Sequence, residues 1–199
     1  MTLLRRFGLL APLAAFSLAG CGLNSVPTAE EQVNAAWANV QSEYQRRADL
    51  IPNLVNTVKG YAQQERTVLT EVTNARARAS SIQLNASDLD DPAKVQAFNQ
   101  AQTQLGSSLG RLLATFENYP DLKSNQNFLT LQAQIEGTEN SILVARRDYN
   151  ESVRAYNTRI RTFPDAIGAK IFYGAKPKVP FEAAAGAQEA PKVDFNTAG

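Results

Sequence analysis

A charged cluster beside a proline is the first group of residues that could bind a partner. Arg46, Arg47 and Asp49 precede Pro52 inside a segment whose apolar spacing predicts one long helix. Proline has no N–H group, so a continuous helix would bend there and leave the carbonyl of Ala48 without its usual donor. A free carbonyl beside charged side chains would suit a partner-binding notch. Alternatively, the bend wraps the helix around a bundle and the charges are solvated or paired, and the sequence favours this second interpretation.

Catalytic chemistry finds little support in the residue types present. The chain contains no His and one Cys, which removes the commonest general base, the commonest metal ligand and any disulfide framework. It shows no glycine-rich phosphate loop and no nucleophile elbow. Acidic pairs such as Asp90–Asp91 and Glu136–Glu139 are better explained as helix caps and solvated faces. We therefore expect a non-enzymatic protein without cofactor or metal, and a carboxylate-dependent hydrolase is the alternative.

Length and charge limit the remaining functions. The 199 residues suggest one domain with appendages. The 20 Lys and Arg nearly cancel the 19 Asp and Glu, and no long basic run is present. Charge therefore gives no support to nucleic-acid binding, and we expect no nucleic-acid partner.

The N-terminal residues predict an exported protein. Arg5 and Arg6 precede the apolar stretch 7–19, which is too short to span a bilayer comfortably as a helix. The stretch ends in Leu-Ala-Gly-Cys, which resembles the lipobox of bacterial lipoproteins. This resemblance implies a signal peptide over 1–20 and lipidation of Cys21, the only Cys, at the start of a linker over 21–28. The alternatives are a retained membrane helix, or an ordinary export signal beside a buried Cys.

The resemblance to a lipobox also implies a cellular location. A lipid on Cys21 would hold the chain in the cell envelope, facing the periplasm. Each buried CH₂ contributes ~0.8 kcal/mol and a single chain binds only marginally, so stable anchoring takes several acyl chains. In lipoproteins of Gram-negative bacteria an Asp after the Cys commonly retains the protein at the inner membrane. Gly22 stands there instead, which favours the outer membrane.

Apolar residues recur at alternating steps of three and four along most of the chain, which is the spacing of a heptad seam. The pattern predicts an all-α fold, an elongated antiparallel helical bundle over 29–173 with long, coiled-coil-like helices. One further short helix could follow Pro164. The long helices are expected near 29–80, 92–118 and 124–163.

Single residues predict where two helices begin and whether the first helix continues through Pro52. Thr28 and Asp91 are the predicted N-caps, and Pro92 follows as the first residue of its helix. The seam keeps its register across Pro52, which favours a kinked continuous helix. The alternative is two helices, the second with Asp49 as its N-cap.

The first predicted helix is longer than the others, which cannot cover its whole length. Its seam around 33–44, including Trp37 and Tyr44, is therefore expected to lack a partner, and an exposed stripe of that kind usually marks an interface. A kink at Pro52 would angle this segment towards a second copy, another protein or the membrane surface. Alternatively, the short helix after Pro164 folds back and covers it.

The C-terminal tail, 174–199, combines several prolines with a lack of apolar periodicity. We expect it to be mostly disordered. The segment PKVDF at 191–195 is an exception, because it could dock on a groove or a partner. A mere extended end is the alternative.

Three parts of the chain carry specific motifs: AWANVQSEYQRRADLIPNLVNTVKGYAQQE, the segment that starts FENYPDLK and runs to SVRAYNT, and FPDAIGA with the later PKVDF. Together they resemble the LemA family of bacterial envelope proteins. The resemblance covers roughly residues 33–195 and implies a helical, membrane-associated protein whose biochemical role is poorly defined. Many members look as if they keep an N-terminal transmembrane helix, whereas the segment here is shorter and ends in a lipobox.

The family motifs also imply candidate site residues. Packing alone does not explain Asn53, Glu139, Arg146 or Asn150, and the last three share one face of a helix. They could form a buried network that fixes helix register, or a recognition surface. We expect a membrane-anchored scaffold or adaptor that binds an unidentified envelope protein, with a homo-oligomer as a second option. The candidate interaction surface comprises Arg46, Arg47, Asp49, Pro52, Asn53, Lys59, Glu139, Arg146 and Asn150.

Overall fold

A computed structural model describes residues 24–60 and 65–182, and the statements below concern these residues. The predicted signal peptide and the lipid site at Cys21 lie outside them, as does the PKVDF motif at 191–195. Within the described part, no helix combines the length and the apolar character needed to cross a membrane.

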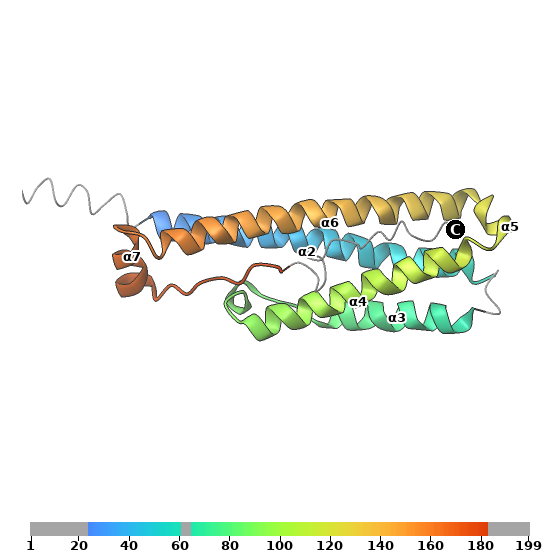
Figure 1. The fold of residues 1–199 in the computed structure, drawn as a ribbon, viewed down its shortest axis with the longest axis horizontal. Helices are drawn as coiled ribbons and strands as arrows, with labels where there is room; N and C mark the ends of the chain where they lie inside the picture. Colours follow the sequence, from blue (N-terminus) through green and yellow to red (C-terminus); the bar gives the residue numbers. More distant parts are fainter. Residues whose placement is uncertain (1–23, 61–64, 183–199) are drawn as a thin grey trace, which may run out of the picture.

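The described residues form an all-α, elongated bundle, as the apolar spacing predicts (Figure 1). Two long helices, α2 and α6, lie side by side along its whole length, and α3 and α4 form a hairpin against them. The long helices are α2 (Ser25–Val58), α3 (Arg66–Ser81), α4 (Pro92–Phe116) and α6 (Gln126–Arg159). Short elements join or follow them: η1 (Ala86–Asp88), α5 (Pro120–Lys123), α7 (Asp165–Gly168) and η2 (Ala169–Tyr173).

The first predicted helix divides into two. α2 continues through Pro52, in agreement with the continuous-helix interpretation, but it ends at Val58, and α3 begins at Arg66. The prediction of one helix over 29–80 is therefore wrong. Gly60, two residues after the end of α2, disfavours continuation of the helix.

Helix starts follow local capping chemistry. Asp91 caps α4 by accepting hydrogen bonds from two backbone N–H groups of the first turn, at 2.9 and 3.3 Å, and Pro92 is the first helical residue as predicted. The prediction of Thr28 as N-cap of the first helix is wrong, because α2 already begins at Ser25. The earlier start is possible because Pro27 lies in the first turn, where its missing N–H costs nothing.

The bundle contains two cores. α2 and α6 have 34 residues each and run antiparallel through both. In the distal half, where α2 ends and α6 begins, they pack with α3 and α4 around a mainly aliphatic core: Ile51, Leu54, Val58, Leu105, Leu109, Leu112, Phe116, Leu122, Phe128 and Ile135. In the proximal half, where α2 begins and α6 ends, the core is rich in aromatic rings: Val33, Trp37, Val40, Tyr44, Phe98, Ile142, Tyr149, Val153, Tyr156 and Phe181.

Residues 174–182, here called the strap, run back over the proximal half without helical structure (Figure 1). Gly174 starts the strap with a φ of +54°, a left-handed conformation that glycine adopts without a steric penalty. Near the other end, the Phe181 ring is buried and stacks on Trp37 at 6.0 Å between centroids. The expectation of disorder over 174–199 is therefore wrong for the strap, because an extended segment needs no apolar periodicity when its backbone finds partners on the bundle.

The apolar seam in the first half of α2 is covered. Trp37 and Tyr44 are both buried, and Phe98 of α4 packs edge-on against their rings at 5.3 and 5.4 Å. The Trp37 indole N–H donates to the carbonyl of Leu84, between α3 and α4, at 3.1 Å. The expected exposed stripe is therefore absent from this part of the chain. The seam is covered by α4, by the segment between α3 and α4 and by the strap. The spacing of apolar residues does not predict where these parts of the chain lie.

Candidate interaction surface

The residues of the predicted surface separate into a buried group and an exposed group. Arg47 is 2% exposed, and its guanidinium donates to Glu139 of α6 at 2.7 Å. It also donates to the backbone and side-chain oxygens of Gln102 of α4, at 3.1 and 2.9 Å. Gln102 in turn donates to the carbonyl of Ala79 of α3 at 3.4 Å. These three side chains, here called the polar layer, connect all four long helices of the described chain at the junction of the two cores.

Arg47 is held by packing as well as by hydrogen bonds. Its guanidinium carbon lies 5.2 Å from the centroid of the Tyr44 ring, within cation–π range. Burial raises the pKa of Tyr44, although the charges of Arg146 and Arg47 act in the opposite direction, so its hydroxyl stays protonated at neutral pH. The Glu139 side chain is 42% exposed and brings the polar layer to the surface. Arg47 is therefore part of a network that fixes helix register and is closed to a partner.

The carbonyl released by Pro52 has a donor on another helix. Arg76 of α3 donates its Nε hydrogen to the carbonyl of Ala48 at 2.8 Å. This charged donor replaces the N–H that proline lacks, and it docks α3 against α2 at this turn. The partner-binding notch, which was the less favoured interpretation, is filled by the chain's own Arg76 side chain, in agreement with the favoured one.

Two asparagines on one face of α6 hold the strap by paired hydrogen bonds. Asn157 accepts from the N–H of Lys178 and donates to its carbonyl, both at 2.8 Å. Asn150 binds Phe181 in the same way, at 2.8 and 3.0 Å. Seven helical residues rise ~10.5 Å and three extended residues span ~10 Å, so the two asparagines match the pitch of an antiparallel strap.

Arg146 and Tyr149 add contacts to the same strap. The Arg146 guanidinium donates to the carbonyl of Glu182 at 3.1 Å and lies 4.7 Å from the centroid of the Phe181 ring. The Tyr149 hydroxyl donates to the carbonyl of Val179 at 3.0 Å, and burial raises the pKa of Tyr149, which keeps it a donor. This part of the predicted surface therefore binds the chain's own strap.

Three residues that hold the strap against the bundle, Tyr149, Asn157 and Lys178, were missing from the predicted surface. Lys178 is 8% exposed, and its ammonium pairs with Glu30 of α2 at 3.0 Å. Asn157 holds the other end of the strap, as described above. The seven-residue interval between Asn150 and Asn157 puts both on one helical face, which was the available signal for Asn157. No signal in the sequence pointed to Lys178.

The other members of the predicted surface are exposed on α2 and make only weak contacts. Arg46 lies 4.0 Å from Glu43, and Asp49 accepts a hydrogen bond from Gln45 at 2.7 Å. Exposed pairs of this kind contribute little to stability. The exposed members are Arg46, Asp49, Pro52, Asn53 and Lys59.

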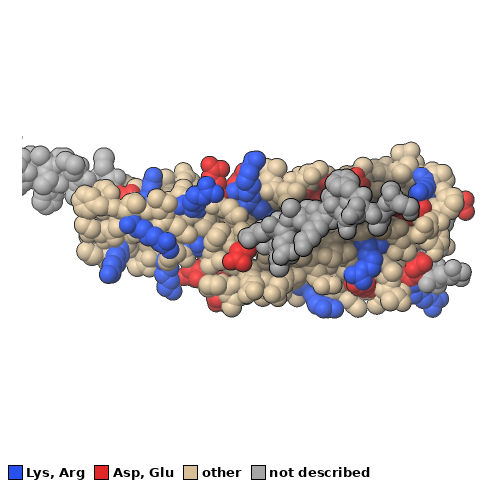
Figure 2. Space-filling view, viewed as in Figure 1, with Lys and Arg blue, Asp and Glu red and all other residues tan. Residues whose placement is uncertain are grey.

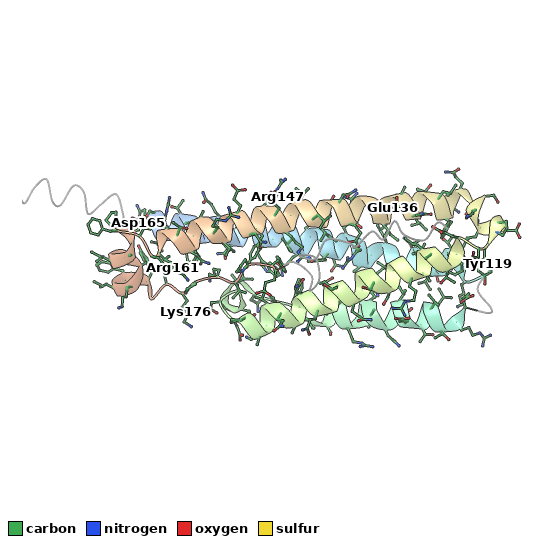
Figure 3. The ribbon with its side chains drawn as sticks, in the orientation of Figure 1. Tyr119, Glu136, Arg147, Arg161, Asp165 and Lys176 are labelled. Carbon is green, nitrogen blue, oxygen red and sulfur yellow. The ribbon has the colours of Figure 1, made fainter. Side chains whose placement is uncertain are left out.

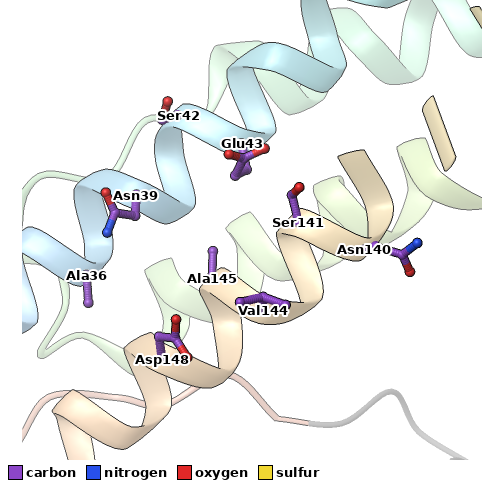
Figure 4. A pocket seen from close by; sticks show the side chains of 9 residues that line it. All are labelled: Ala36, Asn39, Ser42, Glu43, Asn140, Ser141, Val144, Ala145 and Asp148. Carbon is purple, nitrogen blue, oxygen red and sulfur yellow. The ribbon is translucent and has the colours of Figure 1, made fainter. Parts of the chain in front are cut away.

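A groove of about 450 Å³ lies between α2 and α6, and we call it the α2–α6 groove (Figure 4). Its lining is mostly small or polar, which lets another backbone approach closely. None of its residues belongs to the predicted surface. The lining residues are Ala36, Asn39, Ser42 and Glu43 of α2 with Asn140, Ser141, Val144, Ala145 and Asp148 of α6.

The α2–α6 groove combines an apolar side chain with acidic ones. Val144 is half exposed on the α6 side. Glu43 lies between the two helices in Figure 4. Its Oε2 atom is buried without a hydrogen-bond donor within the described chain and lies 4.0 Å from the Arg46 guanidinium. Asp148 pairs with the adjacent Arg147 at 3.0 Å on the surface. The groove therefore offers a hydrophobic contact and acidic side chains to a partner.

Carboxylates do not gather into a metal site in the described residues. No group of three or more His, Cys, Asp or Glu is placed there to hold a metal ion. Glu136, labelled in Figure 3, is exposed on α6 and accepts a hydrogen bond from Gln132 at 3.1 Å. Asp91 caps α4. Converging acids would have favoured a carboxylate-dependent hydrolase, and this part of the chain shows none.

Antiparallel helices of equal length, a clamped strap and an open interhelical groove define an elongated helical-bundle protein. The chain belongs to the LemA family, whose family model matches residues 36–195. The resemblance of the sequence motifs is thereby confirmed.

Comparison with individual proteins gives the same family. The chain is 27% identical over 140 residues to Protein LemA of Metamycoplasma hominis, which covers 70% of this chain and 60% of that protein. It is 26% identical over 157 residues to Magnetosome protein MamQ 2 of Paramagnetospirillum magneticum and to Magnetosome protein MamQ of Magnetospirillum gryphiswaldense. Each of these matches covers 71% of this chain and 58% of the relative, so the chain spans about three fifths of these relatives' length.

Proposed function

We propose that this chain is a membrane-anchored, non-enzymatic scaffold or adaptor of the cell envelope that binds another envelope protein in the α2–α6 groove. The groove is the observation that carries the proposal. It lies on the two helices that run the length of the bundle, and its lining includes half-exposed Val144 and partly exposed Glu43. By contrast, Arg47, Arg146 and Asn150 of the predicted surface are engaged within the chain.

The geometry of the groove suits an α-helix as the bound segment. Grooves between antiparallel helices receive a third helix when small residues let the backbones approach, and Ala36 and Ala145 supply such positions. An aliphatic side chain of the partner would cover Val144. A Lys, Arg or Asn of the partner would donate to Glu43.

The non-enzymatic part of the proposal is supported by the roles of the carboxylates. Glu139 neutralises Arg47, Glu30 neutralises Lys178, and Asp91 caps a helix. Each is used to stabilise the fold. A hydrolase would need carboxylates released from such duties and directed at a bound substrate.

The membrane part of the proposal rests on the sequence before the described residues. Cys21 follows the apolar stretch 7–19 and precedes α2 by only a few residues, so a lipid there would hold the bundle close to the bilayer. The envelope location, the periplasmic side and the preference for the outer membrane follow from the lipobox and Gly22. A retained membrane helix would present the same domain at the same surface.

Photo-crosslinking in intact cells tests the groove. A benzoylphenylalanine at Val144 is expected to crosslink one envelope protein, whereas the same probe at Ala77, exposed on α3, is not. Val144→Glu should abolish capture by a second probe at Asn140, because it puts a charge at the apolar contact. Ala77→Glu is the matched control and should leave capture intact. Equal crosslinking from both probe sites would contradict the proposal.

The anchor is tested separately. Mass spectrometry of the protein extracted from envelopes should find Cys21 as an acylated N-terminus, and Cys21→Ser should accumulate as unprocessed or soluble precursor. An unmodified chain that starts at residue 1 or 2 would disprove lipidation while leaving the groove test unaffected.

A further inference from the structure

The proximal end of the bundle carries an exposed apolar cluster, here called the tip, formed by Phe163, Ile167, Ile171 and Phe172. These side chains are between 53% and 83% exposed. Phe163 continues the seam of α6 in the sequence, but the helix ends at Arg159, so the Phe163 ring has no core to enter. The other three lie on α7 and η2. Apolar side chains grouped in this way on a soluble surface usually mark a binding site.

The tip lies where the first residues of the chain join the bundle. Arg159 of α6 donates to the carbonyl of Ser25, the first residue of α2, at 3.1 Å, and lies 3.7 Å from Asp165 of α7. Figure 1 shows the start of α2, the end of α6 and α7 at the same end of the molecule. The segment 1–23 therefore connects to the bundle beside the tip.

Basic residues lie near the tip. Residues 159–176 contain four Lys or Arg and one acid, Asp165, which gives a net charge of +3 for this segment. Two of the four are paired, Arg159 with Asp165 and Lys176 with Asp90, and the other two are Arg161 and Lys170. In Figure 2 the surface at the α7 end is mostly uncharged, and several Lys and Arg lie next to it, towards the middle of the molecule. Arg161 and Lys176 are labelled on this part of the molecule in Figure 3. Aromatic and aliphatic side chains bordered by basic ones are the composition that binds the headgroup region of anionic bilayers.

The bilayer is also within reach. Four residue steps separate Cys21 from Ser25, and an extended chain covers at most ~3.5 Å per step, so the Cα of Cys21 lies within ~14 Å of the start of α2. A lipid on Cys21, or a membrane helix that ends near residue 19, would therefore bring the headgroups to the side of the tip.

We propose that the tip inserts into the headgroup region of the bilayer that anchors the chain, with its basic residues against anionic lipids. The inference rests on the proposed membrane anchor and adds a second point of attachment. Two attachments at the proximal end fix the orientation of the bundle on the membrane. The α2–α6 groove is then presented at a constant height above the bilayer.

Depth-dependent fluorescence quenching tests the insertion. Full-length Phe172→Trp is reconstituted into vesicles of phosphatidylethanolamine and phosphatidylglycerol, with or without brominated acyl chains. Native Trp37 is buried and provides the same background in every variant. The fluorescence that the new tryptophan adds should fall at least ~2-fold with brominated lipid, as expected for a ring buried about 5–10 Å into the boundary between headgroups and acyl chains.

The matched control is Leu143→Trp, because Leu143 is as exposed as Phe172 but lies midway along α6. Its emission should be insensitive to brominated lipid. Arg161→Glu with Lys170→Glu should reduce quenching of Phe172→Trp, and more so as the phosphatidylglycerol content rises. Circular dichroism and thermal unfolding verify that each variant is folded.

Other outcomes separate this inference from the anchor. Chains that fail to float with vesicles would contradict the native anchor, and coupling their only Cys, Cys21, to a maleimide lipid then allows the same quenching measurement. Tethered or anchored protein without quenching at position 172 would disprove insertion. Self-association that shields position 172 from water without quenching would show that the tip binds a second copy, and would also overturn the proposal.

Discussion

The two halves of the bundle bury similar helices in different ways. The distal half packs four long helices around mainly aliphatic side chains, most of them contributed by the regular seam of a long helix. The proximal half has two full-length helices and only the start of α4, and its core is completed by Leu84, by Leu89 and by Phe181 of the strap. Packing between helices therefore completes the core where the apolar seams of four helices meet. Where fewer helices are present, irregular segments complete the core, and their backbone N–H and C=O groups need side chains as hydrogen-bond partners.

In the proximal half these partners are amide and hydroxyl side chains. They bind the backbone of the strap, which lacks the regular backbone hydrogen bonds of a helix or sheet. Asn150, Asn157 and Tyr149 satisfy the backbone of the strap. The polar layer around Arg47 lies between the two halves and makes them share one register. The comparison therefore predicts where each kind of substitution will act.

The largest effects are expected from truncating one aromatic ring in each core. Trp37→Ala and Phe116→Ala should each lower the free energy of unfolding by ~3–5 kcal/mol, because both rings are buried in packed surroundings. Urea unfolding followed by circular dichroism should show one transition in both variants, since α2 and α6 run through both cores. Two separate transitions in Trp37→Ala would show that the halves fold independently.

A smaller loss is expected at the junction. Arg47→Ala should cost ~2–3 kcal/mol, because Gln102 and Glu139 lose a charged donor, and the partial exposure of Glu139 limits the penalty. Arg47→Lys should recover only part of this loss, since one ammonium cannot reproduce the fork of the guanidinium. Arg46→Ala is the matched control and should change stability by less than ~0.5 kcal/mol. Chemical denaturation of the three variants checks this order.

Release of the strap should have a moderate effect confined to the proximal half. Asn157→Ala removes two hydrogen bonds to Lys178 and should cost ~1–2 kcal/mol. Limited trypsin digestion should then cleave after Lys178 faster than in the wild type, because that side chain is normally buried. Asn140→Ala, exposed on the same helix, should leave the cleavage rate unchanged. If trypsin cleaved Asn157→Ala after Lys178 at the wild-type rate, the role of Asn157 in holding the strap would be disproved.

The smallest effect is expected at the proline in α2. Arg76→Ala should cost ~1 kcal/mol in the wild type, because the Ala48 carbonyl loses its donor. In a Pro52→Ala background the loss should be ~0.5–1 kcal/mol smaller, since the new N–H can serve that carbonyl. Sedimentation of Pro52→Ala should match the wild type because the seam before it is covered within the chain. A changed oligomeric state would reopen an assembly role for the proline.

The sequence was sufficient for the repeating part of the fold. Seam residues such as Val40, Leu109 and Ile142 are buried as their spacing predicts, because a helix presents every third or fourth residue to the same side. Asp91 and Pro92 located one helix start, because a cap depends on atoms only a few residues apart. The family was also recognisable from local motifs.

Only the tertiary structure showed which residues of the candidate site bind other parts of the chain and which are exposed to a partner. Arg47 lies between buried Tyr44 and Ile51 at the spacing of the seam, whereas the adjacent Arg46 lies off the seam and is exposed. Only the positions of α4 and α6 give Arg47 its partners Gln102 and Glu139. The strap, the donor for Ala48 and the α2–α6 groove each join residues far apart in the chain. The sequence by itself determined which residues face inward on each helix, because that depends on local geometry. Tertiary structure decided what they face, because those partners come from helices and extended segments whose placement depends on packing across the whole chain.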